Sequence, residues 1–204
     1  MIVERPEAAW AMYVLAHGAG AGMRHPFLET LSAALAREGV ATLRYQFPYM
    51  EAGSRRIDPA QVLEARVREA VAAAREHGLP LVAGGKSMGG RMTSQAQACE
   101  PLPGVRGIAF VGFPLQPARA PANKRADHLR GVRVPMLFLQ GSRDELASLE
   151  LLQPILVELP QATLHVIPDA DHSFHVPKRT GRTDAQIIEE LARELAAWAR
   201  PLAS

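Results

Sequence analysis

The chain has 204 residues, which suffices for one substantial hydrophobic core but not for two ordinary domains, so we expect a single domain over residues 1–204. With 48% hydrophobic and 22% charged residues, its composition is that of a folded globular protein and excludes a disordered chain. The formal net charge is only +2, and no block of Lys and Arg is long enough to follow a phosphate backbone, so we expect no nucleic-acid partner.

Cysteine use and the first ten residues indicate the compartment. The single cysteine, Cys99, excludes an internal disulfide framework and fits a reducing environment. The segment 1–10 carries Glu4, Arg5 and Glu7 where a signal peptide needs an apolar run, and no apolar stretch reaches the length of a membrane span. We therefore expect a cytoplasmic protein without a membrane partner, in which Cys99 is a buried structural thiol.

Strand and helix patterns alternate from one end of the chain to the other. Short apolar runs predict buried strands, and proline-free segments with apolar residues at helical spacing predict helices. Their alternation predicts an α/β fold, with a doubly wound, mostly parallel sheet flanked by helices. In chain order, the predicted elements are a strand at 11–16, a helix at 26–37, a strand at 40–45, a helix at 59–76 capped by Asp58, a strand at 79–84, a helix at 90–100, strands at 105–111 and 135–139, a helix at 149–159, a strand at 162–167 and a helix at 184–199.

The segment Gly85-Lys86-Ser87-Met88-Gly89 lies between a predicted strand and a predicted helix. A Gly-x-Ser-x-Gly segment in that place is typical of the nucleophile elbow, a sharp turn that lifts a serine hydroxyl clear of the sheet. Glycine is needed on both sides of the serine because a Cβ atom there would strike the neighbouring strand and helix. The pattern therefore predicts that Ser87 is a catalytic nucleophile.

Candidate partners for Ser87 follow later strands, at the sheet edge where the carboxyl ends of parallel strands place reacting groups. Asp144 and His172 each follow a predicted strand, which gives the chain order serine, acid, histidine. Histidine side chains ordinarily titrate near neutral pH, so His172 can take the serine proton, and Asp144 can hold the imidazole in the correct tautomer. Glu145 remains the alternative acid and His175 the alternative base, and a helix cap is the non-catalytic interpretation of Asp144.

Backbone N–H groups near Ser87 are candidates for an oxyanion hole, which stabilises negative charge that develops on oxygen. The N–H of Met88 opens the following helix and is one predicted donor. The glycine-rich segment 17–22 supplies the second, from Ala19 or alternatively from Gly20. The predicted substrate-binding residues are Gly18, Gly20, Tyr45, Phe47 and Tyr49. For the three aromatic residues of this set, an equal alternative is that they only pack their loop onto the sheet.

Three further polar residues lie near the predicted site. His17 opens the glycine-rich segment, where a structural hydrogen-bonding role is more common than that of a base. Lys86 and Arg91 lie close to the serine in sequence, so they are candidates for binding an anionic substrate. Local pairing or solvation of these two charges is the simpler interpretation.

Two nucleotide-binding motifs are incomplete in this chain. Gly85-Lys86-Ser87 matches the end of a P-loop, but the first glycine of that motif falls on Pro80. Gly18-Ala19-Gly20 begins a dinucleotide fingerprint, but its third glycine falls on Met23. We therefore expect no nucleotide, no other cofactor and no metal ion.

The motifs lie in five segments, His17 to Gly22, Phe47 to Glu51, Gly84 to Arg91, Gln140 to Asp144 and Asp171 to Phe174. In these segments the chain resembles the α/β-hydrolase superfamily, and more narrowly the compact branch near the dienelactone hydrolases. That branch also includes testis-expressed hydrolase-like proteins and a scaffold subunit of an animal histone-acetyltransferase complex. The resemblance implies a minimal α/β-hydrolase fold without a cap domain, with Ser87, Asp144 and His172 as a triad. Dienelactone hydrolases use a cysteine nucleophile, so the serine here makes dienelactone a poor guess for the substrate.

We predict a serine hydrolase that cleaves a small ester, thioester or related acyl bond, with a small-molecule acyl substrate as its partner. A non-catalytic scaffold or binding protein with a hydrolase fold and an acyltransferase with the same nucleophile remain open, and a homodimer is compatible with the sequence. The connection 113–134 is too short for a helical cap, which predicts an open, shallow site for short or compact acyl groups, including anionic ones. Its prolines, basic residues and histidine are Pro114, Pro117, Arg119, Pro121, Lys124, Arg125, His128, Arg130 and Arg133.

Overall fold

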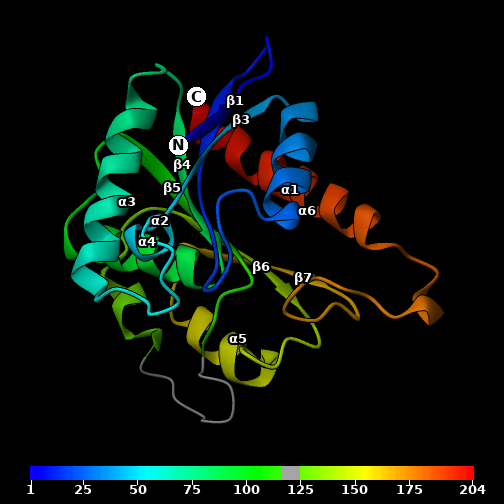
Figure 1. Cartoon of the computed structure of the whole chain (residues 1–204). Coiled ribbons are helices and arrows are strands. Elements are labelled where there is room, and N and C mark those ends of the chain that lie inside the picture. Colours follow the sequence, from blue (N-terminus) through cyan, green and yellow to red (C-terminus); the bar gives the residue numbers. More distant parts are fainter. Residues whose placement is uncertain (116–124) are drawn as a thin grey trace.

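A computed structural model describes residues 1–115 and 125–204 of the chain (Figure 1). Within these residues, seven strands form one sheet in the order β1-β3-β2-β4-β5-β6-β7. Neighbouring strands run parallel except β1, which pairs with β3 in the antiparallel direction. The strands are β1 (Ile2–Glu4), β2 (Ala11–Ala16), β3 (Val40–Tyr45), β4 (Leu81–Lys86), β5 (Val105–Val111), β6 (Met136–Gly141) and β7 (Ala162–Ile167).

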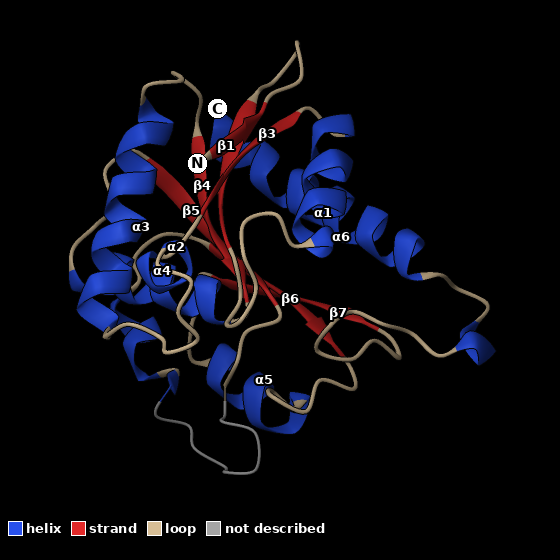
Figure 2. Cartoon of the chain, viewed as in Figure 1, coloured by secondary structure: helices blue, strands red, loops and turns tan. Residues whose placement is uncertain are grey.

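Helices cover both faces of this sheet (Figure 2), which confirms the predicted doubly wound α/β fold. One face packs against α1 and α6, and the other against α3, α4 and α5. Alternate residues of β2 serve the two cores, because successive strand side chains point to opposite faces. The helices are α1 (Pro26–Arg37), α2 (Pro48–Glu51), α3 (Ala60–Arg75), α4 (Met88–Cys99), α5 (Leu149–Val157) and α6 (Asp184–Ala199), with short 3-10 helices η2 (Asp127–Gly131), η3 (Lys178–Thr180) and η4 (Arg200–Ala203).

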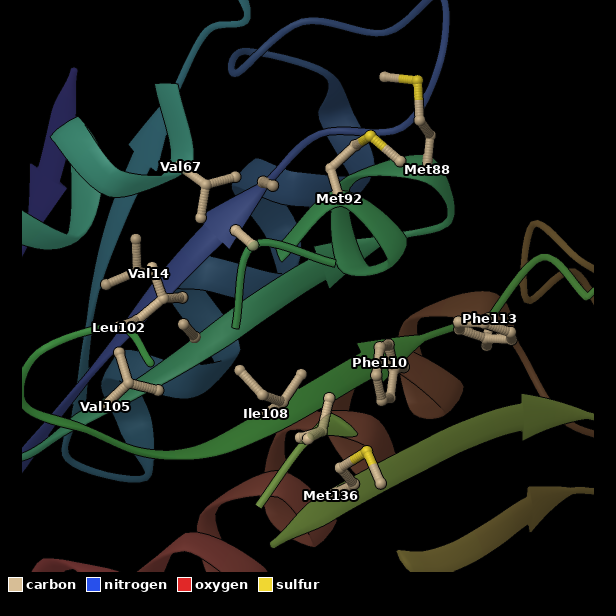
Figure 3. Packing of buried hydrophobic residues seen from close by; sticks show 14 of the residues in the cluster. Val14, Val67, Met88, Met92, Leu102, Val105, Ile108, Phe110, Phe113 and Met136 are labelled. Carbon is tan, nitrogen blue, oxygen red and sulfur yellow. The ribbon is translucent and has the colours of Figure 1, made fainter. Parts of the chain in front are cut away.

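Aromatic packing fixes the carboxyl ends of β5 and β6, which border the candidate site. Phe110 stacks on Phe138 with ring centroids 4.4 Å apart, and Phe113 packs edge-on against both rings at 5.1 and 5.7 Å. Figure 3 shows Phe110 and Phe113 in the same core as Met88, the first residue of α4. Large buried rings contribute strongly to a core, so this cluster holds the strand ends in a fixed position.

Apart from the short 3-10 helices, which were not predicted, the predicted elements agree with the structure except at some ends and for two omissions. The strand predicted at 79–84 is β4, and the helix predicted at 90–100 begins earlier, at Met88. The sequence prediction omits β1 and α2, which have three and four residues. Elements this short carry too few residues for a hydrophobic period to be recognised.

Two expectations about single residues are wrong. Asp58 does not cap α3, because the helix starts one residue later, after Pro59, and has no side-chain cap. Instead, Asp58 Oδ2 accepts a hydrogen bond of 2.8 Å from the backbone N–H of Tyr49. Cys99 lies on α4 as expected but is exposed, because it is the last residue of the helix, about one turn beyond the buried Ala96.

Part of the connection 113–134 lies outside the described residues, including Pro117, Arg119, Pro121 and Lys124. The described remainder contains η2, whose Leu129 is buried in the same core as α3 and α4. None of the helices in residues 1–115 and 125–204 combines the length and the apolar character that crossing a bilayer requires.

Candidate active site

Ser87 lies in the sharp turn between β4 and α4. Its backbone has φ 51° and ψ −119°, a conformation that a residue with a side chain rarely adopts. The flanking glycines are needed for the reason that the sequence suggests. A Cβ atom on Gly85 would lie 2.4 Å from the backbone oxygen of Ala16, and one on Gly89 would lie 2.6 Å from the backbone oxygen of His17. The close approach of β2 to this turn therefore requires glycine on both sides of Ser87.

Ser87, His172 and Asp144 come from the ends of three strands and meet at one edge of the sheet. His172 Nε2 lies 2.9 Å from Ser87 Oγ, and His172 Nδ1 lies 2.7 Å from Asp144 Oδ2. The side chain of Asp144 is fully buried, whereas that of His172 is 23% exposed. Because the carboxylate accepts a hydrogen bond from Nδ1–H, the proton of the neutral ring is on Nδ1. Nε2 is therefore free to accept the serine proton.

Asp144 is itself held by hydrogen bonds from two sides. Its Oδ1 accepts the backbone N–H of Leu146 at 2.8 Å, and its Oδ2 accepts the amide of Gln140 at 2.5 Å. Gln140 is completely buried, and its Oε1 in turn accepts the backbone N–H of Phe113 at 2.9 Å. The sequence prediction missed Gln140, although a polar residue in the apolar strand before Asp144 is a signal that could have identified it.

The alternative acid and base identified from the sequence occupy other positions. His175 is exposed, and its Nδ1 pairs with Asp184 at 2.9 Å, which raises the pKa of His175 through hydrogen bonding and charge. Glu145 is exposed, one residue beyond Asp144. Asp171 accepts the backbone N–H groups of Ser173 and His175 and so forms the turn that carries His172.

His17 and Gln46 fix the glycine-rich segment beside Ser87. His17 is buried, its Nδ1 donates to the backbone oxygen of Gly18 at 2.8 Å, and its Nε2 accepts the backbone N–H of Phe47 at 3.1 Å. Burial lowers the pKa of His17, so the ring stays neutral in this structural role. The side-chain oxygen of Gln46 accepts the backbone N–H of Met23 at 2.9 Å and holds the far end of the segment.

A cavity of about 330 Å³ lies beside Ser87 and His172. Two predicted residues of the glycine-rich segment, Gly18 and Ala19, line it, but Gly20 does not; Gly20 forms an open turn with φ 71°. The N–H of Met88 belongs to the first turn of α4 and therefore has no carbonyl partner within the helix. The residues that line the cavity are Gly18, Ala19, Ala21, His25, Phe27, Leu28, Lys86, Ser87, Leu146, His172 and Ser173.

The predicted aromatic residues lie elsewhere. Tyr45, Phe47 and Tyr49 are each at most 2% exposed, and none of them lines this cavity. Their rings pack edge-on in the core, with Phe47 4.9 Å from the ring of His17 and 5.5 Å from that of Tyr45. This matches the alternative that they pack their loop onto the sheet. The apolar wall is formed instead by Phe27 and Leu28 of α1 and by Leu146.

The sequence did not indicate this wall because Phe27 and Leu28 read as ordinary core positions of a helix. Their place shortly after the glycine-rich segment is the signal that could have identified them, since that segment lines the cavity beside Ser87 and leads from β2 to the start of α1. Arg91, in contrast, does not line the cavity, and Lys86 Nζ donates a hydrogen bond to the backbone oxygen of His172 at 2.6 Å. The ammonium group of Lys86 is therefore paired locally, with a backbone oxygen.

A second serine–histidine pair lies farther along α4. Ser94 Oγ is 2.8 Å from His128 Nε2 and also donates toward the backbone oxygen of Arg91 at 2.9 Å. Ser94 is completely buried. Burial and the charge of Arg91 lower the pKa of His128 to about 4. Within residues 1–115 and 125–204, His128 makes no hydrogen bond to a carboxylate, and no cluster of three or more His, Cys, Asp or Glu side chains is placed to hold a metal ion.

Comparison with known proteins agrees with this fold. A family model described as an alpha/beta hydrolase domain matches residues 9–200. The chain belongs to the alpha/beta hydrolase family. This confirms the resemblance drawn from the sequence, and the family together with the contact between Ser87 and His172 indicates serine hydrolase activity.

Solved structures of the same fold include a dienelactone hydrolase from Anabaena variabilis, with a TM-score of 0.76 and 21% identity over 97% of this chain and 89% of that one. An alpha-beta serine hydrolase homologue from Coxiella burnetii has a TM-score of 0.73 and 22% identity over 95% and 90% of the two chains. A serine hydrolase without a lid from Xanthomonas campestris has a TM-score of 0.73 and 21% identity over 96% and 87%. At sequence identities of 21–22%, the similarity to these structures shows a shared fold.

Proposed function

We propose that the protein hydrolyses small carboxylic esters or thioesters through an acyl-enzyme intermediate on Ser87. The observation that carries this proposal is the continuous hydrogen-bonded chain from Asp144 through His172 to Ser87 Oγ, which opens into a cavity. A serine hydroxyl is a weak nucleophile until a base contacts it, and here the base has a buried carboxylate behind it. A binding protein has no need of these three groups in contact.

The reaction follows from the two hydrogen bonds of His172. As Ser87 Oγ attacks the acyl carbon, its proton passes to His172 Nε2, and Asp144 stabilises the imidazolium that forms. The tetrahedral oxyanion then collapses, the bond to the leaving alcohol or thiol breaks, and the imidazolium returns the proton to the leaving atom. A water molecule repeats the sequence on the acyl-enzyme, which releases the carboxylic acid and regenerates Ser87.

The oxyanion requires donors that are already in place. In this proposal they are the N–H of Met88, at the positive end of α4, and the N–H of Ala19, on the cavity wall. Each such donor contributes about 3–4 kcal/mol to transition-state stabilisation. The short distance between the glycine-rich segment and the elbow supports this pairing, since a Cβ atom on Gly18 would lie 3.6 Å from Ser87 Cβ.

The cavity supports a short acyl group as substrate. Its volume of about 330 Å³ is near the lower limit of about 300 Å³ for small-molecule pockets. Ala19, Phe27, Leu28 and Leu146 give it an apolar wall, which suits an uncharged acyl chain of a few carbons. Arg130 and Arg133 of the basic connection do not line it, so these two residues provide no reason for an anionic substrate.

A chain-length series of p-nitrophenyl esters, from acetate to palmitate, tests this function. We expect kcat/KM to be highest for acetate to butyrate and to fall at least about tenfold by octanoate, because longer chains exceed the apolar wall. The matched thioesters should follow the same order. A steady rise of kcat/KM toward palmitate would contradict the proposed substrate size, and no turnover of any ester or thioester would contradict the proposed activity.

A further inference from the structure

Lys86 is a charged residue of the cavity that the proposed mechanism does not use. It is the last residue of β4 and directly precedes Ser87. Its Nζ donates a hydrogen bond of 2.6 Å to the backbone oxygen of His172. One side chain from the nucleophile's own strand thus contacts the backbone of the base, which lies 86 residues away in the sequence.

The neighbouring strand leaves room for this contact. Gly112, just beyond the end of β5, has φ 73°, and a Cβ atom there would lie 3.0 Å from Lys86 Nζ. The same atom would lie 3.4 and 3.5 Å from Cε1 and Nδ1 of His172. The absence of a side chain at this position therefore lets the ammonium group and the imidazole ring share one space.

The loop that carries His172 is irregular and contains strained backbone. Phe174 has φ 64° and is buried, with its ring stacked on that of Phe27 at 5.9 Å. Lys86 Nζ lies 5.5 Å from the centre of the Phe174 ring, within the range of a cation–π contact. The turn made by Asp171 holds the N–H groups of Ser173 and His175, whereas the carbonyl of His172 is held by Lys86.

We propose that Lys86 is a positioning residue for His172, whose backbone it fixes so that the imidazole spans the distance between Asp144 and Ser87. The proposal rests on the proposed hydrolase function. A bond from an ammonium group is roughly twice as strong as one between neutral groups, so Lys86 restrains this strained loop more than a neutral side chain does. The restraint keeps His172 in the geometry that proton transfer requires.

The charge of Lys86 gives the restraint a pH limit. Burial lowers the pKa of Lys86 to about 8, although the carboxylates of Asp144 and Asp171 act in the opposite direction. The titratable groups that face it are these two carboxylates and the imidazole of His172, with His25 lining the same cavity. As pH rises past about 8, the ammonium group loses its proton and the bond weakens. We therefore expect kcat to decline above that pH.

The first test compares Lys86→Met with Lys178→Met, a change at an exposed lysine on η3. Methionine keeps the length and bulk of the stem but removes the charge and the donor. For Lys86→Met we expect kcat to fall about 10- to 100-fold, KM to change less than about threefold, and the decline above pH 8 to disappear. For Lys178→Met we expect wild-type kinetics. A Lys86→Met enzyme within twofold of wild-type kcat, with the same alkaline decline, would overturn the proposal.

Chemical rescue separates the charge from a general effect on folding. In a Cys99→Ser background, Lys86→Cys can be alkylated with 2-bromoethylamine, where the thiolate displaces bromide and forms a side chain as long as lysine with a terminal ammonium. Alkylation with bromoethane gives a similar side chain without the charge. We expect the amine to restore kcat at least tenfold and the ethyl group to restore none. Equal recovery with both reagents would contradict a role for the ammonium group.

Proton NMR keeps this test independent of the proposed function. The imidazole N–H of His172 that donates to Asp144 should give a downfield resonance, assigned by its loss in His172→Ala. We expect the resonance to be sharp in the wild type and broadened or absent in Lys86→Met. If the wild type turns over no ester, the proposed function fails, but a sharp, unshifted resonance in Lys86→Met is the result that overturns the positioning role.

Discussion

Two serine–histidine pairs lie close together in this protein, one at the start of α4 and one within it. The Oγ to Nε2 distance is 2.9 Å for Ser87 and His172 and 2.8 Å for Ser94 and His128. Ser87 lies in a strained turn at a cavity, whereas Ser94 is completely buried in a regular helix. Behind His172 is the buried carboxylate of Asp144, and near His128 is the charge of Arg91.

A short serine–histidine contact does not by itself make a nucleophile. The base has to be stabilised as it gains a proton, and the hydroxyl needs space in which an acyl carbon can approach it. Around His128 both burial and a neighbouring cation oppose protonation, so its contact with Ser94 serves the structure. At Ser87 both requirements are met, because Asp144 lies behind the base His172 and the cavity gives an acyl carbon access to the hydroxyl.

The largest expected effect comes from removing each serine in turn. Ser87→Ala should lower kcat for p-nitrophenyl acetate by at least about 10⁴-fold, because the nucleophile is lost. Ser94→Ala should leave kcat within about threefold of the wild type. It should instead reduce the free energy of unfolding by about 1–2 kcal/mol, because His128 Nε2 loses its buried hydrogen-bond partner. Steady-state kinetics and urea unfolding measure the two effects, and comparable losses of kcat would remove the distinction between the pairs.

A smaller loss is expected when the carboxylate behind His172 is neutralised. Asp144→Asn should lower kcat by about 10³- to 10⁴-fold, since the amide can favour the wrong imidazole tautomer and cannot stabilise the imidazolium. Glu145→Gln, one residue along the chain, is the matched control and should cost far less. If Glu145→Gln proves the more damaging change in the same ester assay, Asp144 is not the acid.

The smallest effect concerns His128 and acid stability. The pKa of His128 is about 4 in the folded protein and about 6.5 for an ordinary histidine, so the unfolded chain binds the proton more tightly. The neutral ring therefore supports full stability above about pH 6.5, and stability is lost as pH falls toward 4. We expect His128→Gln to lose about 2 kcal/mol less unfolding free energy between pH 7 and pH 5 than the wild type. Urea unfolding at both pH values measures this, and an equal loss in both proteins would contradict it.

The sequence predicted the parts of this site that depend on local pattern. Ser87, Asp144 and His172 each follow an apolar strand, and parallel strands bring their carboxyl ends to one edge, so their meeting could be inferred. The apolar wall of the cavity could not be inferred, because a periodic pattern of apolar residues does not show which element faces the cavity. Phe27 and Leu28 have the same pattern as core residues of any helix, and Phe47 has that of an exposed loop aromatic.

The contact between Lys86 and the backbone of His172 could not be predicted from the sequence either. The hydrogen bond from Lys86 to the backbone oxygen of His172 joins residues 86 positions apart and depends on where the loop after β7 lies once the sheet has formed. No residue type at a fixed spacing signals a bond to a backbone oxygen. For Asp58, the signal existed but was misread, since an aspartate before a proline has the pattern of a helix cap.

Labelling with a fluorophosphonate probe tests the assignment of the nucleophile most directly. The probe forms a bond from serine Oγ to phosphorus with loss of fluoride, and it needs an activated, accessible hydroxyl. Trypsin cleaves after Arg91, so Ser87 and Ser94 fall on different peptides, one ending at Arg91 and the other spanning 92–106. We expect one adduct per chain, on the peptide that contains Ser87. An adduct on the peptide 92–106, or no adduct in a preparation that hydrolyses p-nitrophenyl acetate, would contradict Ser87 as the nucleophile.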